Sequence, residues 1–206
     1  MLWAHHGLFH AKNTLLQSPR GAETGMTAYV ALLRGINVGK GNRLPMADLR
    51  ALLSELGYTD VATLLNSGNA VFKAARGPSA KLGAQIADAI AATLGMRIAV
   101  VVKSAPEWEA VVQGNPLATA APDHSRLFAI CAQDVAALQG LTHLVPLLVE
   151  PEAFHIGSHA AYLHCAGGVL ESKAGAALMS KGGPTVTTRN WATTLKLQGL
   201  LQARAS

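Results

Sequence analysis

The chain has 206 residues, of which 50% are hydrophobic, and it carries 17 basic and 12 acidic side chains. This composition excludes a disordered or collagen-like protein and provides enough apolar surface for a buried core. Two cysteines are too few for a disulfide scaffold or a structural zinc site, and no apolar run reaches the roughly 18 residues of a membrane span. We therefore expect a globular cytoplasmic protein without membrane association.

The first 25 residues differ in character from the rest of the chain. They contain His5, His6 and His10, but no basic segment precedes an apolar stretch as it does in a signal peptide. Three histidines without a fixed framework are poor evidence for a metal site. We interpret residues 1–25 as a disordered extension without function, and Met26 as a plausible first residue of the protein.

Residues 26–114 follow the order strand, helix, strand, strand, helix, strand. The expected strands are short apolar runs, and the expected helices carry leucine or isoleucine at intervals of three and four residues. The sequence Asn66-Ser67-Gly68-Asn69 is typical of a hairpin turn. The predicted strands are 27–33, 61–65, 70–72 and 97–102, and the predicted helices are 45–56, 79–94 and 106–112. This is the βαββαβ order of a ferredoxin-like unit.

Residues 115–125 contain proline, alanine and serine and are typical of a linker. After them the same order of elements recurs more weakly, since residues 142–151 show no clear period. The predicted strands here are 126–132, 154–156, 161–164 and 185–188, and the predicted helices are 134–138, 171–179 and 191–203. We therefore predict an α+β protein with two ferredoxin-like halves, 26–114 and 126–206, the second of which ends in a C-terminal helix.

The loop between the first strand and the first helix is the strongest candidate for a binding site. It carries Arg34, Lys40 and Arg43, three glycines and no acidic residue. Glycines let backbone N–H groups converge, and the start of the following helix adds positive potential, so the loop suits an anion. Its spacing matches neither the Walker A nor the G-x-G-x-x-G pattern. The alternative is a solvated loop whose charges only promote solubility.

A second group of polar residues is expected beside this loop. In a split βαβ unit, the loop after the first strand and the turn between the second and third strands share one edge of the sheet. The loop and the turn then bring several polar side chains together, and each is a candidate ligand contact: Asn37, Asn42, Asn66, Ser67 and Asn69. The alternative for residues 66–69 is a turn without function.

The sequence of the second half predicts another cationic spot. The start of the helix 171–179 and the end of the strand 185–188 are expected at one sheet edge, so Ser172 and Lys173 would lie near Arg189. Thr188 and Asn190 are further candidate contacts there. Asn190 also suits the N-cap of the last helix, and Trp191 is expected to pack inward.

No motif in the sequence identifies catalytic residues. Cys131 and Cys165 fall in or beside predicted strands, where we expect them to be buried and not joined by a disulfide. The histidines show no metal-ligand spacing, and no nucleophile motif is present. We therefore expect neither a metal nor a cofactor.

Four segments carry a resemblance to a known family. They are YVALLRGINVG at residues 29–39, LPMADLRALLSELGYTDVATLLNSGNAVF at residues 44–72, the pair Ser172-Lys173, and TTRNWATTLKL at residues 187–197. With these motifs the chain resembles the bacterial family catalogued as domain of unknown function 1697 (DUF1697), from Met26 to the C-terminus. The resemblance implies a two-lobed α+β protein with ferredoxin-like subdomains, and it implies no particular activity.

These features together predict that the protein binds an anionic ligand at the basic loop. The ligand would be a phosphate, a nucleotide or nucleic acid, although a net charge of +5 and strands poor in aromatic residues disfavour a large nucleic-acid footprint. One alternative is an enzyme acting on a small phosphorylated or nucleotide-like substrate. Another is a protein-interaction module without a small ligand, for instance a homodimer.

Overall fold

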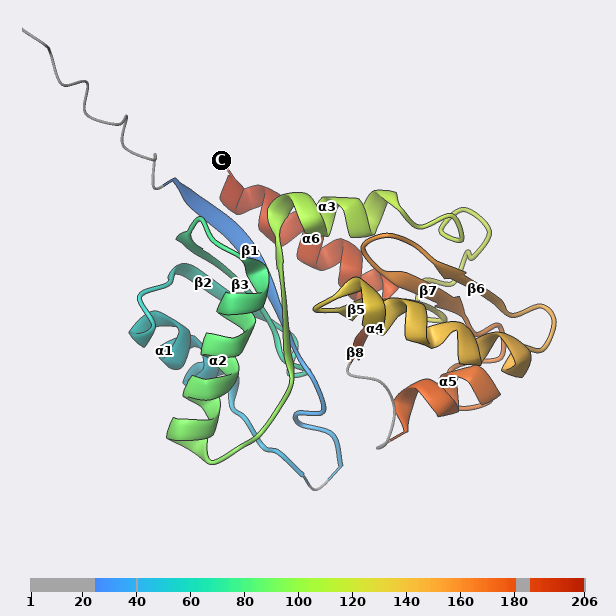
Figure 1. Ribbon diagram of the computed structural model, residues 1–206, viewed down its shortest axis with the longest axis horizontal. Coiled ribbons are helices and arrows are strands. Elements are labelled where there is room, and N and C mark those ends of the chain that lie inside the picture. Colours follow the sequence, from blue (N-terminus) through green and yellow to red (C-terminus); the bar gives the residue numbers. More distant parts are fainter. Residues whose placement is uncertain (1–24, 40, 181–185, 206) are drawn as a thin grey trace, which may run out of the picture.

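The computed structural model describes residues 25–39, 41–180 and 186–205 (Figure 1). Of the extension expected at residues 1–25, all but Gly25 lies outside these described residues. The described chain forms an α+β protein with two four-stranded antiparallel sheets and six α-helices. In the described part of the chain, no helix is long and apolar enough to cross a membrane.

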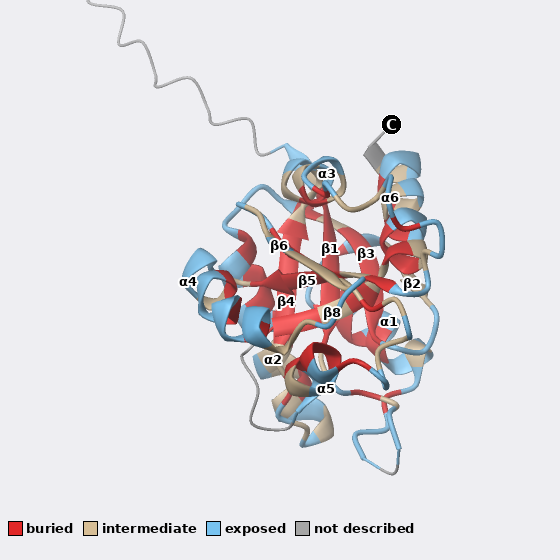
Figure 2. Cartoon of the chain, turned by 90° about the vertical axis from the view of Figure 1, so that its right-hand side faces the viewer, coloured by how far each residue is buried: buried red, intermediate tan, exposed pale blue. Residues whose placement is uncertain are grey.

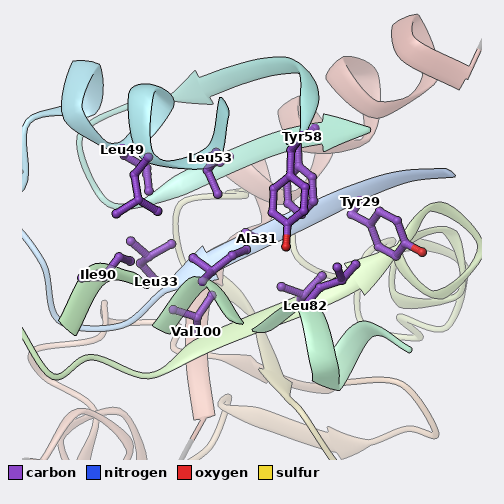
Figure 3. Packing of buried hydrophobic residues seen from close by; sticks show 14 of the residues in the cluster. Tyr29, Ala31, Leu33, Leu49, Leu53, Tyr58, Leu82, Ile90 and Val100 are labelled. Carbon is purple, nitrogen blue, oxygen red and sulfur yellow. The ribbon is translucent and has the colours of Figure 1, made fainter. Parts of the chain in front are cut away.

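The first sheet contains β1 (Met26–Leu33), β2 (Thr59–Leu64), β3 (Asn69–Ala75) and β4 (Val100–Ser104). Its strand order is β2-β3-β1-β4, and neighbouring strands are antiparallel. The helices α1 (Met46–Glu55) and α2 (Ser79–Leu94) cover one face, because their leucines and isoleucines recur at helical spacing. Figure 3 shows Leu49 and Leu53 of α1 packed against this sheet.

The second sheet repeats this arrangement. It contains β5 (Leu127–Ala132), β6 (Ala153–Ile156), β7 (Ala161–His164) and β8 (Val186–Asn190), in the order β6-β7-β5-β8. Its outer face is covered by α4 (Val135–Gln139), the 3-10 helix η1 (Gly140–Leu147) and α5 (Lys173–Met179). Each sheet therefore has its own outer hydrophobic core.

A third core joins the inner faces of the two sheets. The helices α3 (Ala105–Gln113) and α6 (Trp191–Ala205) lie side by side there (Figure 1). Trp108, Tyr162 and Trp191 are buried in this inner cluster together with Val30 of β1. Residues of the segment 115–125 also contribute, since Ala121 is only 1% exposed. Figure 2 shows the buried strands of both halves gathered in one interior.

The predicted elements are all present, but several boundaries differ from the prediction. The strand expected at 97–102 is β4, which begins at Val100, and the strand expected at 185–188 is β8, which reaches Asn190. The helix expected from residue 171 begins at Lys173, because the Ser172 hydroxyl accepts a hydrogen bond from the Gly175 N–H at 3.0 Å and caps it. The sequence analysis does not predict η1, which has a proline inside it.

Candidate ligand-binding pocket

The basic loop and the β2–β3 hairpin lie together, as the sequence predicts. The Leu33 N–H donates to the Gly68 carbonyl at 2.8 Å, at the point where β1 ends. The Asn37 side-chain amide donates to the carbonyls of Asn66 at 2.7 Å and Leu44 at 2.8 Å. In return, the Leu44 N–H donates to Asn37 Oδ1 at 3.0 Å. The Asn37 side chain therefore joins two parts of the loop to each other and joins the loop to the hairpin.

Gly68 permits this close approach of the hairpin to β1. Its φ is +76°, and a Cβ built on it would lie 2.7 Å from Leu33 Cβ and 2.8 Å from Ile36 Cδ1. Side-chain atoms do not approach so closely without displacement, and other L-residues are strained at this φ. The glycine of the predicted turn is therefore required both by backbone conformation and by space.

A pocket of about 330 Å³ lies between the loop, the hairpin and the first turn of α1. Its lining residues are Asn37, Arg43, Leu44, Pro45, Met46 and Asn66. The helix α1 begins after Pro45 without a side-chain cap, so the N–H groups of its first turn have no side-chain partner. These groups favour an anion at the pocket, although Asp48 in the same turn partly offsets their potential.

Arg43 is the cationic side chain among the lining residues. It is exposed, and its Nη2 donates to the Gly39 carbonyl at 3.0 Å. Within the described residues no carboxylate forms an ion pair with Arg43. Arg34 begins the same loop and is half-buried, with its backbone N–H bound to the Ala99 carbonyl at 2.9 Å. The third predicted cation, Lys40, lies outside the described residues.

Arg189 enters this region from the second half of the chain. It is 9% exposed, and its Nη2 donates to the carbonyls of Leu33 at 2.8 Å, Ser67 at 3.0 Å and Gly68 at 3.2 Å. Its Nε donates to Asn69 Oδ1. Its Nη1 donates within β8, to Thr187 Oγ1 at 2.9 Å and to the Thr188 carbonyl at 2.7 Å. The guanidinium group therefore joins β8 to the end of β1 and to the hairpin.

Most of the asparagines predicted to contact a ligand use their side-chain amides for hydrogen bonds within the protein. Asn69 is buried, and its Nδ2 donates to the Leu64 carbonyl at 2.9 Å and to Ser67 Oγ at 3.0 Å. Asn42 Nδ2 lies 3.5 Å from the Gly35 carbonyl within the loop. Ligand contacts by these residues, and by the exposed Asn66 and Ser67, stay predictions.

Among the described residues, Ser172 and Lys173 do not lie beside Arg189, where the sequence predicts them. Residues of β8 alternate between the faces of the sheet, so Arg189 points to the first half, whereas Thr188 points to α5 and its hydroxyl lies 3.7 Å from Met179 Sδ. Ser172 and Lys173 begin α5, which covers the opposite face from Arg189. Ligand contacts by Ser172, Lys173 and Thr188 stay predictions. Asn190 Oδ1 accepts the Thr193 N–H at 2.9 Å and caps α6, as expected.

Burial shifts the pKa values of two groups in the protein interior, Arg189 and Cys131. Desolvation lowers the pKa of Arg189 to about 10, which leaves it charged at neutral pH. Desolvation also raises the pKa of the buried Cys131 thiol to about 11, against the effect of the charges on Lys103 and Arg189. Cys131 and Cys165 are unpaired and buried, as the sequence predicts. The Cys131 thiol is therefore protonated at neutral pH and is a poor nucleophile.

Comparison with known proteins finds a matching family model and a similar solved structure. A family model described as "Protein of unknown function (DUF1697)" matches residues 26–162. The solved structure of the conserved bacterial protein SP0830 from Streptococcus pneumoniae is similar, with 25% sequence identity and a TM-score of 0.72. The similarity covers 86% of this chain and 99% of that protein. No curated protein matches the chain significantly.

Proposed function

The chain belongs to the DUF1697 family, and we propose that it binds a small anionic ligand, a phosphate or nucleotide, in the pocket beside α1. The observation that carries this proposal is the lining of the pocket. Arg43 supplies a charge without a carboxylate partner in the described residues, at the start of a helix that has no side-chain cap. Cationic side chains and free N–H groups at a helix start together favour a phosphate.

The size and lining of the pocket favour a phosphorylated small molecule. A volume of about 330 Å³ lies at the lower end of the roughly 300–1,000 Å³ that is typical of ligand pockets. Leu44, Pro45 and Met46 give it an apolar wall that a phosphate alone would leave uncovered. A nucleic acid, in contrast, is bound through many phosphate contacts along a basic surface. We therefore favour a mononucleotide-like ligand over nucleic acid.

Calorimetric titration with inorganic phosphate and with adenosine monophosphate tests the proposal. We expect the nucleotide to bind more tightly than phosphate, and Arg43→Ala to weaken its binding about tenfold, because a hydrogen-bonded charge is lost. Arg97→Ala is the matched control, since Arg97 is exposed and lines a different hollow with Asp88. If neither probe binds, or if both variants bind like the unaltered protein, the proposal is wrong.

We also propose that residues 26–114 and 126–206 are two ferredoxin-like halves joined by residues 115–125. The support for this division is the matching strand order of the two sheets, β2-β3-β1-β4 and β6-β7-β5-β8, and the same sequence of elements in each half. The halves differ in their helices, since η1 follows α4 only in the second. The pocket lies in the first half.

A further inference from the structure

We propose that Arg189 is a positioning residue for the pocket, so that a side chain of the C-terminal half sets the binding affinity of a site in the N-terminal half. This inference rests on the proposed function of the pocket. It concerns a residue that lies outside the pocket lining and that no sequence motif connects with it.

The acceptors of Arg189 lie in the segments that form the pocket walls. The Leu33 carbonyl directly precedes the basic loop, which leads to Asn37 and Arg43 in the lining. The Ser67 and Gly68 carbonyls directly follow Asn66, which lines the opposite wall. A single guanidinium group thus holds the two walls at a fixed separation, and it is itself fixed to β8 by two hydrogen bonds.

Only an arginine can make this set of contacts. Its planar group presents five N–H donors in a rigid fork, and here the donors reach acceptors on three different segments. A lysine ammonium is a single point with three donors and cannot span the same acceptors. Loss of the fork would take the guanidinium donor from the buried Leu33 carbonyl and would weaken the attachment of the hairpin to β1, which would then rest on the Leu33 N–H bond to Gly68 and the Asn37 bond to Asn66.

The positive charge of Arg189 also favours the binding of an anion in the pocket. Its acceptors are carbonyl, amide and hydroxyl oxygens, and in the described residues no carboxylate pairs with it. A buried charge that is not neutralised by a counter-ion raises the positive potential behind the pocket walls, where the dielectric screening is low. An anion in the pocket would compensate part of this charge.

The test measures adenosine monophosphate affinity and amide hydrogen exchange in Arg189→Lys, with Leu178→Ala as the control. Leu178 is buried in the outer core of the second half, so its truncation destabilises the protein without touching the pocket segments. We expect Arg189→Lys to bind the nucleotide about tenfold more weakly. We also expect faster exchange at the amide of Leu33, which bonds to the hairpin, and at the amide of Leu44, which bonds to Asn37 within the loop. Leu178→Ala should retain the affinity of the unaltered protein.

If Arg189→Lys does not fold, Thr187→Val takes its place, because it removes one acceptor of the guanidinium group and leaves the contacts to the first half. It should produce the same two changes to a smaller extent. If the unaltered protein binds neither phosphate nor adenosine monophosphate, the proposed function fails. The exchange measurement then still tests whether Arg189 holds the pocket segments in place. Unchanged affinity in a protein that does bind, or unchanged exchange at Leu33 and Leu44, would overturn the role of Arg189.

Discussion

At the residue scale, the site depends on a single glycine that brings the hairpin to β1. We expect Gly68→Ala to destabilise the protein by about 2 kcal/mol or more, because strain at positive φ adds to a forced displacement of Leu33 or Ile36. Urea unfolding monitored by circular dichroism measures the change.

Gly57→Ala is the matched control for this substitution. Gly57 has a similar φ of +82°, but a Cβ there would meet nothing within 4 Å. Its substitution should therefore cost only the conformational strain, about 1 kcal/mol. Equal decreases in the free energy of unfolding in the two variants would show that the lack of space beside Gly68, at Leu33 and Ile36, adds nothing to the cost of the substitution.

At the element scale, a carboxylate fixes the start of α3. Glu107 Oε2 accepts hydrogen bonds from Ser104 N–H at 2.7 Å, Ser104 Oγ at 2.9 Å and Ser79 Oγ at 2.5 Å, which ties α3 to the first residue of α2. Burial alone would raise the pKa of Glu107, but these bonds hold it below its usual value.

We expect Glu107→Gln to lower the free energy of unfolding by about 1–2 kcal/mol at pH 7, since a charged acceptor of three hydrogen bonds is lost. A carboxyl group whose pKa is lower in the folded than in the unfolded state stabilises the protein at pH values above its unfolded-state pKa. This stabilisation is lost as the pH falls through the folded-state pKa. The difference between the two proteins should therefore shrink below about pH 4. Glu109→Gln, on the exposed face of α3, should show no such pattern in urea titrations at several pH values.

The elements themselves were largely predictable, because their periodicity and turn residues are local signals. The meeting of the Asn37 loop with the Asn66 turn was also predictable, since it follows from strand order. The role proposed for Arg189 was not, because its partners in the first half lie more than 100 residues away and depend on how the two sheets pack. The alternation of side chains along β8 gives two faces, and only the tertiary arrangement determines which face meets the first half.

At the scale of the whole molecule, the inner core makes the two halves dependent on each other. Val30 of β1, Trp108 of α3 and Trp191 of α6 share one buried cluster with the inner face of the second sheet. Either half alone would expose this apolar surface to water, at a cost of about 25 cal/mol per Å². The Arg189 contacts cross the same boundary. We therefore expect the described chain to unfold as one cooperative unit.

Native-state hydrogen exchange with Leu53→Ala tests this cooperativity. Leu53 is fully buried in the outer core of the first half, so its truncation should cost about 2–5 kcal/mol. If the halves unfold together, the slowest amides of β7 in the second half lose as much protection as those of β1, although Leu53 touches neither β7 nor the inner cluster. Protection lost in β1 but retained in β7 would mean that the halves open separately. A pocket positioned by Arg189 could then lose its shape while the second half stayed folded.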